Sequence, residues 1–257
     1  MHVHTAQPST IDPMSTSPPI GTTLFNPHPV DSTVALTPSQ RCYVIDDALT
    51  DPQALVDFAS SQAFASPVGY PYPGVVLEAP SAVTGGLAEY FAQQVRGLMG
   101  ARRTIDVTVR LSLVTTPAAE LEPRQWQCHR DRIAVDPQAI LFAASVLYLF
   151  DGPALGGTSF YLPRLPAEQM DRMLADSQTL SAAQFSARHG VEPGYMTGSN
   201  TYFERIASVP AKWNRLIFYD GGIFHSADIA QPALLSADPK IGRLTLNGFY
   251  TCKRNAR

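Results

Sequence analysis

The chain has 257 residues, of which 45% are hydrophobic and 16% charged, a composition that predicts a globular protein with a sizeable core. Its formal net charge of −3 argues against nucleic acid as the main partner, because no basic excess is present to neutralise phosphates. No apolar run reaches the roughly 18 residues needed to span a bilayer. Cys42, Cys128 and Cys252 are far apart, and the N-terminus lacks a secretory signal pattern, so we expect a cytoplasmic protein without a membrane partner.

The first part of the chain predicts a tail followed by helices. Residues 1–22 are rich in Ser, Thr and Pro and predict a disordered tail, with a single domain over residues 23–257. A helix is predicted over residues 51–64, with Asp51 as N-cap and Pro52 at the first position. A second helix is predicted over residues 87–99. Its apolar stripe consists of Leu87, Tyr90, Phe91, Val95 and Leu98.

Strands dominate from residue 105 onward. Apolar and polar residues alternate over residues 105–113, which predicts a strand with one buried face. Further strands are predicted over residues 126–135, 140–150, 158–162, 202–208, 215–219, 223–229 and 243–252. Residues 165–189 predict one or two helices inserted between strands. The order of elements indicates a mainly β fold with flanking helices, built on a β-barrel or jelly-roll core.

Three residues form a candidate metal site. His129 and Asp131 lie two apart in a predicted strand, so their side chains point to the same face, and His225 could add a third ligand from another strand. Two imidazoles and one carboxylate leave three octahedral positions open, which suits Fe(II) binding a bidentate co-substrate together with O2. For any one histidine alone, a hydrogen-bonded core or surface position is the commoner explanation.

The segment GRLTLNGF adds a candidate anion site. Arg243, Thr245 and Asn247 alternate on one face of the last predicted strand. An arginine inside a barrel is costly unless it pairs with an anion, and its planar fork matches a carboxylate. Thr245 could add a hydroxyl donor beside it. Pairing of Arg243 with a structural Asp or Glu is the alternative.

Four stretches of the chain resemble a known superfamily. They are HRD at 129–131, YLFDGPALGGTSFY at 148–161, NRLIFYDGGIFHSA at 214–227 and GRLTLNGFY at 242–250. Together they resemble the double-stranded β-helix 2-oxoglutarate/Fe(II) dioxygenase superfamily, in its prolyl-4-hydroxylase-like branch. The resemblance implies a double-stranded β-helix (jelly-roll, cupin-like) core, with iron held by His129, Asp131 and His225.

The same resemblance implies how 2-oxoglutarate would be bound. Arg243, with Thr245 two residues later, would take the distal carboxylate of 2-oxoglutarate, and Tyr148 would contact the same co-substrate. Prolyl hydroxylases commonly have Lys at the place of Arg243, whereas other branches have Arg followed by Ser or Thr. The Gly156-Gly157 element lacks the acidic residue that in the superfamily often precedes the position of Thr158, so the resemblance does not predict the conformation of this loop.

The expected function is hydroxylation of an unactivated C–H bond, in an amino acid or a peptide, with O2 consumed and succinate and CO2 released. Asp131 argues against an iron-dependent halogenase, in which a small residue replaces the carboxylate. A protein kinase reading of HRD fails because position 136 holds Asp136 instead of Asn. The alternative from another class is a non-catalytic cupin-like protein that binds a metal or ligand. Residues 165–189 and 192–202 could form a lid.

Overall fold

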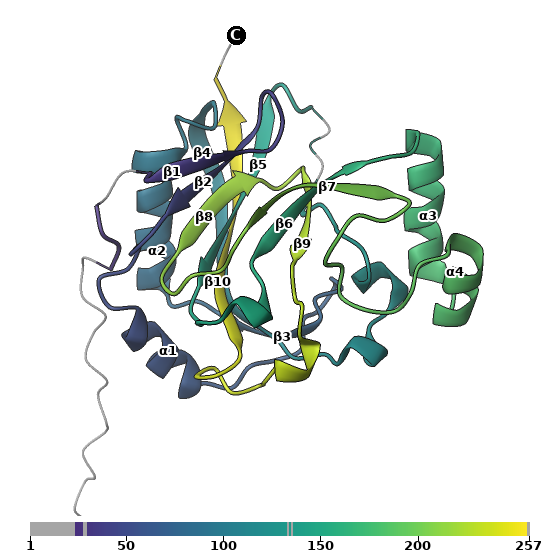
Figure 1. The fold of residues 1–257 in the computed structure, drawn as a ribbon. Helices are drawn as coiled ribbons and strands as arrows, with labels where there is room; N and C mark the ends of the chain where they lie inside the picture. Colours follow the sequence, from purple (N-terminus) through teal and green to yellow (C-terminus); the bar gives the residue numbers. More distant parts are fainter. Residues whose placement is uncertain (1–23, 28–29, 133, 135, 256–257) are drawn as a thin grey trace, which may run out of the picture.

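A computed structural model describes residues 24–27, 30–132, 134 and 136–255 of the chain. The predicted tail, residues 1–22, therefore lies outside the described residues. Two antiparallel sheets make up the centre of the protein, and helices flank them (Figure 1). This confirms the prediction of a mainly β fold with flanking helices. No helix in the described residues is long and apolar enough to cross a membrane.

The larger sheet has seven strands, and the last strand of the chain is one of its inner strands. Its order is β1 (Ser32–Ala35), β2 (Arg41–Ile45), β8 (Leu216–Asp220), β5 (Ile140–Tyr148), β10 (Arg243–Arg254), β4 (Ala101–Val114) and β3 (Gly74–Glu78). All neighbours are antiparallel. Strand β10 pairs with both β4 and β5, so that Thr245 stands opposite Ser112 on one side and Tyr148 on the other. Along β10, successive side chains point to opposite faces of the sheet.

The smaller sheet has three strands in the order β7 (Phe203–Val209), β6 (Thr158–Pro163) and β9 (Phe224–Ala227). An isolated antiparallel bridge joins His129 to His225 of β9. The segment before Asp131 therefore runs along the free edge of this sheet, which places both histidines at one location.

Two helices cover one face of the larger sheet (Figure 1). Helix α1 (Pro52–Ser60) begins as predicted, since Asp51 accepts a hydrogen bond from the backbone of Ala54 at 3.1 Å. Helix α2 (Ser81–Tyr90) continues into a π-helical turn, Phe91–Val95. Their apolar residues pack against the leucines of β4 and β10, where each fully buried leucine contributes about 1.5–3 kcal/mol to folding.

The other two helices form the predicted insertion. Helices α3 (Ala167–Thr179) and α4 (Ala182–His189) pack on Trp126, Phe203 and Phe224. Figure 1 shows them beyond the smaller sheet, away from α1 and α2. Single 3-10 turns occur at Ala118–Glu120, Pro123–Gln125, Pro153–Leu155 and Pro232–Leu234.

Three predictions of local structure were wrong or incomplete. Residues 126–135 form no strand among those described, because the backbone of His129 pairs with His225 whereas that of Asp131 pairs with Gly221. The second helix starts at Ser81 instead of residue 87, and Leu98 is 58% exposed because the helix ends before it. Strands β1, β2 and β3 were not predicted, since they are short and only partly alternating.

Candidate metal centre and its cavity

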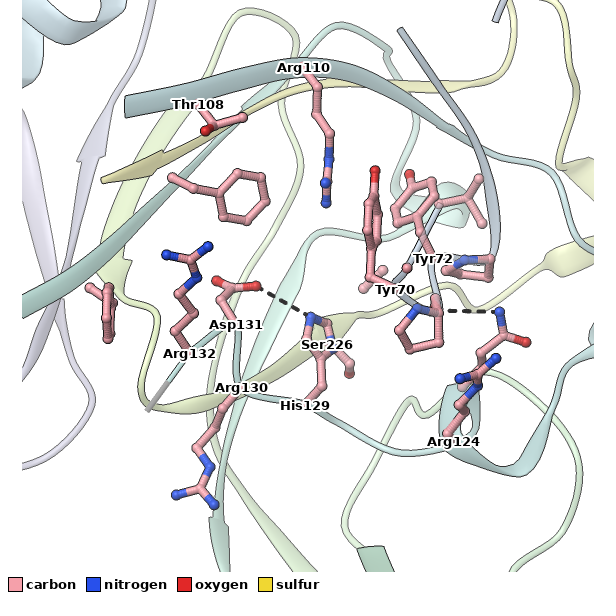
Figure 2. Close-up of a pocket in the computed structure, with 18 of the residues that line it drawn as sticks. Tyr70, Tyr72, Thr108, Arg110, Arg124, His129, Arg130, Asp131, Arg132 and Ser226 are labelled. Atoms are coloured by element: carbon pink, nitrogen blue, oxygen red, sulfur yellow. Dashed lines mark hydrogen bonds and ion pairs between the residues drawn. The ribbon is translucent and has the colours of Figure 1, made fainter. Parts of the chain in front are cut away.

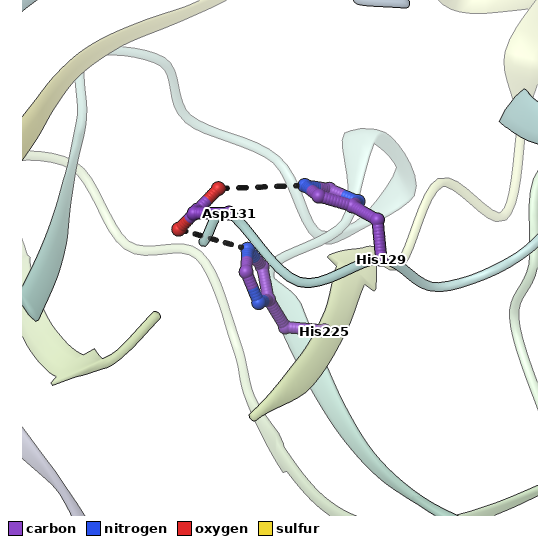
Figure 3. A group of neighbouring side chains, drawn as sticks. All are labelled: His129, Asp131 and His225. Atoms are coloured by element: carbon purple, nitrogen blue, oxygen red, sulfur yellow. Dashed lines mark ion pairs between the residues drawn. The ribbon is translucent and has the colours of Figure 1, made fainter. Parts of the chain in front are cut away.

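His129, Asp131 and His225 lie together, as the sequence predicted (Figure 3). One donor atom from each residue lies within 4.8 Å of the other two. His129 Nε2 is 3.7 Å from Asp131 Oδ1, and His225 Nε2 is 3.6 Å from Asp131 Oδ2. His129 N–H donates to the His225 carbonyl at 2.9 Å and His225 N–H donates back at 2.8 Å, which holds the two backbones together.

A hydrogen bond to one ring nitrogen of His225 determines which nitrogen is available to bind a metal. Its Nδ1 lies 2.9 Å from the carbonyl oxygen of Ile223, and a carbonyl only accepts, so Nδ1 carries the proton. In the neutral ring Nε2 then presents a lone pair on the side of Asp131. A backbone partner of this kind is the usual way in which a metal-ligating imidazole is oriented.

Charge interactions within the group favour an ionised carboxylate. Burial alone would raise the pKa of Asp131, but His225 and His129 outweigh burial and hold that pKa well below its usual range. Burial would lower the pKa of His225, yet Asp131 raises it overall. Desolvation of its ring within the concave cavity and the neighbouring His225 lower the pKa of His129. The carboxylate therefore supplies the negative charge that a divalent cation favours, and each imidazole in its neutral form supplies a nitrogen lone pair.

The donor atoms fit a metal ion. Asp131 Oδ2 is buried without a hydrogen-bond partner among the described residues, although a buried carboxylate oxygen normally has one. The side chain of His129 is 58% exposed, whereas those of Asp131 and His225 are 16% and 6% exposed. Two imidazole nitrogens and one carboxylate, open on the side of His129, could hold a divalent metal with positions left for other ligands.

A cavity of about 660 Å³ opens at this group (Figure 2). His129 and Asp131 line it, and Arg243 lines it as well. Strand β4 contributes Asp106, Thr108 and Arg110, so the polar face of this strand borders the cavity. The alternation predicts one buried face for this strand, and its other face, on which Asp106 and Thr108 are exposed, borders the cavity.

Arg243 is 4% exposed and forms no ion pair with any described carboxylate. Its Nε–H donates to the Leu155 carbonyl and its Nη2–H to the Gly157 carbonyl, both at 2.9 Å. Burial lowers the pKa of its guanidinium group, opposed by nearby tyrosine hydroxyls. The structure thus gives no support to pairing with a structural acid. A buried cation beside a cavity without a carboxylate partner can accept an anion from outside the chain.

Thr245 and Tyr148 lie next to Arg243, but their hydroxyls are already engaged. Thr245 Oγ1 lies 3.4 Å from the Ser112 carbonyl and accepts from Asn247 Nδ2 at 3.1 Å. Tyr148 is fully buried, and its hydroxyl lies 2.8 Å from Thr158 Oγ1. Contact of either residue with a co-substrate therefore stays a prediction.

Sequence reasoning missed Tyr72 and Ser112. Among the described residues neither buried hydroxyl has a hydrogen bond of normal geometry, although Tyr72 lies close enough to Ser112 to interact with it, and burial raises the pKa of Tyr72 to about 12. Tyr72 lines the same cavity as Arg243, and Ser112 stands opposite Thr245. The only signal in the sequence was the YPYP run at residues 70–73, where alternating prolines hold the chain extended.

Several solved structures are similar to this chain at low identity. A Pseudomonas putida prolyl-4-hydroxylase has 14% identity and a TM-score of 0.38, with 84% of this chain and 93% of that chain covered. AviO1 from Streptomyces viridochromogenes Tue57 has 13% identity and a TM-score of 0.33, with 83% and 89% covered. EvdMO1 has 18% identity and a TM-score of 0.30, with 66% and 31% covered.

A comparison with curated proteins gives no match. A family model matches residues 27–250, which includes all six candidate site residues named above from the sequence, and its description is "Family of unknown function (DUF6445)". The chain belongs to this family.

Proposed function

We propose that the protein is an Fe(II)- and 2-oxoglutarate-dependent dioxygenase with a double-stranded β-helix core. The observation that carries the proposal is the convergence of His129, Asp131 and His225 at a cavity that His129, Asp131 and Arg243 line. Two imidazoles and a carboxylate with open positions are typical of non-haem Fe(II) oxygenases. The buried, unpaired charge of Arg243 supports an anionic co-substrate in the same cavity.

Each part of the site has a role in this proposal. His129, Asp131 and His225 would hold the iron, and Arg243 would hold the distal carboxylate of 2-oxoglutarate. Bound Fe(II), with 2-oxoglutarate and O2, supplies the oxidising power for hydroxylating an unactivated C–H bond, with succinate and CO2 released. The protein orients the reactants and excludes water.

A cupin-like protein that binds a metal without turnover is the second candidate. The three ligands alone are compatible with it, because metal binding does not require a co-substrate. Arg243 distinguishes the two candidates, since a pure metal-binding protein has no need for an unpaired buried cation beside the ligands.

The test measures iron content, 2-oxoglutarate binding and succinate formation in the full chain. We expect wild type to retain Fe(II), to bind 2-oxoglutarate and to form succinate, slowly when no substrate is present. Asp131→Asn should weaken Fe(II) retention by at least about 100-fold, because loss of an outer ligand partner alone costs about 10–100-fold. Asp106→Asn is the matched control, since Asp106 lines the same cavity but lies outside the ligand group.

Two outcomes would contradict the proposal. Full iron retention in both His225→Ala and Asp131→Asn would mean that the metal site lies elsewhere. Iron retention by the wild type without 2-oxoglutarate binding or succinate formation would favour the cupin-like binding protein.

A further inference from the structure

Arg110 enters the cavity from β4 between aromatic rings (Figure 2). Its guanidinium carbon lies 4.2 Å from the ring centroid of Tyr70 and 4.6 Å from that of Phe249, with Tyr72 at 6.0 Å. Rings on several sides attract the cation and restrict its rotamers. The guanidinium group is therefore held in place before any ligand arrives.

The charge of Arg110 has no counter-charge in contact with it. No ion pair within the described residues includes Arg110, and its Nε is buried without a hydrogen-bond partner. Glu78 is its register partner on β3 and Asp106 lies on the same strand, yet neither pairs with it. A buried donor without a partner is destabilising, so an acceptor from a ligand would restore the missing hydrogen bond.

The whole cavity is cationic although the chain carries a net charge of −3. Its lining contains five arginines and two aspartates. The arginines are Arg110, Arg124, Arg130, Arg132 and Arg243, and the aspartates are Asp106 and Asp131. Asp131 belongs to the metal group, and Arg124 is already paired with Glu122 at 2.6 Å. A concave surface with an excess of one sign of charge concentrates ligands of the opposite sign.

Arg110 and Arg243 are separate positions within this cavity. Two donors of Arg243 are used by the Leu155 and Gly157 carbonyls, whereas Arg110 is held only by rings. The groups in contact with the Arg110 guanidinium are the rings of Tyr70, Tyr72 and Phe249. A ligand at Arg110 would therefore combine an oxyanion with an apolar body, unlike 2-oxoglutarate, which is short and charged at both ends.

We propose that Arg110, held between Tyr70 and Phe249, binds an oxyanion group of the substrate, a carboxylate or a phosphate. The substrate is then a small organic anion with an apolar body, and Arg110 selects it over neutral analogues. This inference rests on the proposed oxygenase function, in which Arg243 serves the co-substrate and leaves Arg110 for the substrate.

The test is calorimetric binding to the full chain loaded with Fe(II) and saturating 2-oxoglutarate without oxygen. The probes are 3-phenylpropanoate, phenyl phosphate, inorganic phosphate and the neutral 3-phenylpropanamide. We expect at least one aromatic anion to bind about tenfold or more tightly than the amide, a difference that a charge-assisted contact can supply. Preference for 3-phenylpropanoate identifies a carboxylate, and preference for phenyl phosphate identifies a phosphate.

The variants compare two arginines of one strand. Arg110→Gln should abolish the preference for the anion. Iron content and 2-oxoglutarate affinity should change less than about twofold, which is small compared with the tenfold preference that is lost. Arg102→Gln removes the same charge from an exposed position of β4 outside the cavity, and it should behave as wild type. Arg110→Lys should retain part of the preference, since the charge remains but the planar fork is lost.

Three results would overturn the inference. They are equal binding of anions and amide by wild type, a preference that survives in Arg110→Gln, and loss of 2-oxoglutarate binding in Arg110→Gln. The last would make Arg110 the co-substrate anchor. If the chain binds neither iron nor 2-oxoglutarate but still prefers the aromatic anion through Arg110, the oxygenase proposal fails and the anion site stands.

Discussion

Gly221 packs directly against the carboxylate of Asp131. The Asp131 N–H donates to the Gly221 carbonyl at 2.9 Å, and a Cβ placed on Gly221 would stand 3.0 Å from Asp131 Oδ2. The same Cβ would lie 3.2 Å from the Phe142 carbonyl oxygen, which limits how far the backbone of residue 221 can move away. The position of the only anionic ligand thus depends on a residue without a side chain.

Gly221→Ala should therefore displace the Asp131 carboxylate and weaken metal binding. We expect a loss of about 10–100-fold in Fe(II) affinity, the range found when a partner that orients a ligand is removed. Equilibrium dialysis measures it, with circular dichroism to confirm folding. Gly85→Ala is the control, because Gly85 is exposed in α2 with open space around it, and it should stabilise the fold by about 0.5–1 kcal/mol. Unchanged affinity in Gly221→Ala would show that Asp131 tolerates the shift.

The Asp131–His225 pair should give the metal-free protein a defined pH window of stability. The raised pKa of His225 stabilises the fold fully below about 6.5, its unfolded value, and this contribution is lost as pH rises through the folded pKa. The lowered pKa of Asp131 stabilises the fold above about 3.9 and is lost as pH falls through its folded pKa. Asp131→Asn should cost most stability between about pH 4 and 6.5.

Urea denaturation of the metal-free protein at several pH values tests this window, with Asp106→Asn as the control. Fe(II) affinity should follow the opposite trend: it should rise with pH until the folded pKa of His225 is passed and level off above it, because the metal competes with a proton for that imidazole. A cost of Asp131→Asn that is constant across these pH values would contradict the coupling between the two residues.

Arg243→Leu should affect both co-substrate binding and stability. Loss of one partner of a buried charge pair costs about 2–5 kcal/mol, or roughly 30-fold to several-thousand-fold in 2-oxoglutarate affinity. The Leu155 and Gly157 carbonyls also lose their donors, which should lower the free energy of unfolding by about 1–3 kcal/mol each. Iron content should be nearly unchanged, and Arg243→Lys should be intermediate in both measurements. An unchanged 2-oxoglutarate titration in folded Arg243→Leu would place the anchor elsewhere.

Tyr148→Phe separates a structural tyrosine from a co-substrate ligand. The Tyr148 hydroxyl is satisfied by Thr158 in the core, so we expect about 1 kcal/mol lower stability from the lost hydrogen bond. We also expect the affinity for 2-oxoglutarate to change less than about twofold. Loss of a contact that contributes about 1.4 kcal/mol to binding would lower the affinity about tenfold. Calorimetric titration measures the affinity, and Thr158→Val is the matched control because it removes the other half of the same bond. A tenfold loss of affinity in Tyr148→Phe alone would assign the hydroxyl to the co-substrate.

The sequence by itself determined the later strands of the larger sheet, the start of α1 and the three candidate ligands. Alternation of apolar residues predicted β4 and β10, because only one face of each strand meets the helices. Asp51 and Pro52 predicted the start of α1 through local capping, which needs no tertiary contact. The spacing of His129 and Asp131 predicted two ligands on one side of the chain, and the structure brings His225 to them.

Only the tertiary structure decided what surrounds these ligands. Residues 126–135 alternate like a strand, yet their hydrogen bonds go to His225 and Gly221, partners far along the chain that no local pattern reveals. From the sequence, the polar face of β4 would be expected to face solvent. Alternation of polar and apolar residues indicates that the two faces of a strand differ, but it does not indicate what each face contacts. Packing of the YPYP segment against β4 turned that face into a cavity wall, where Arg110 meets Tyr70 and Phe249.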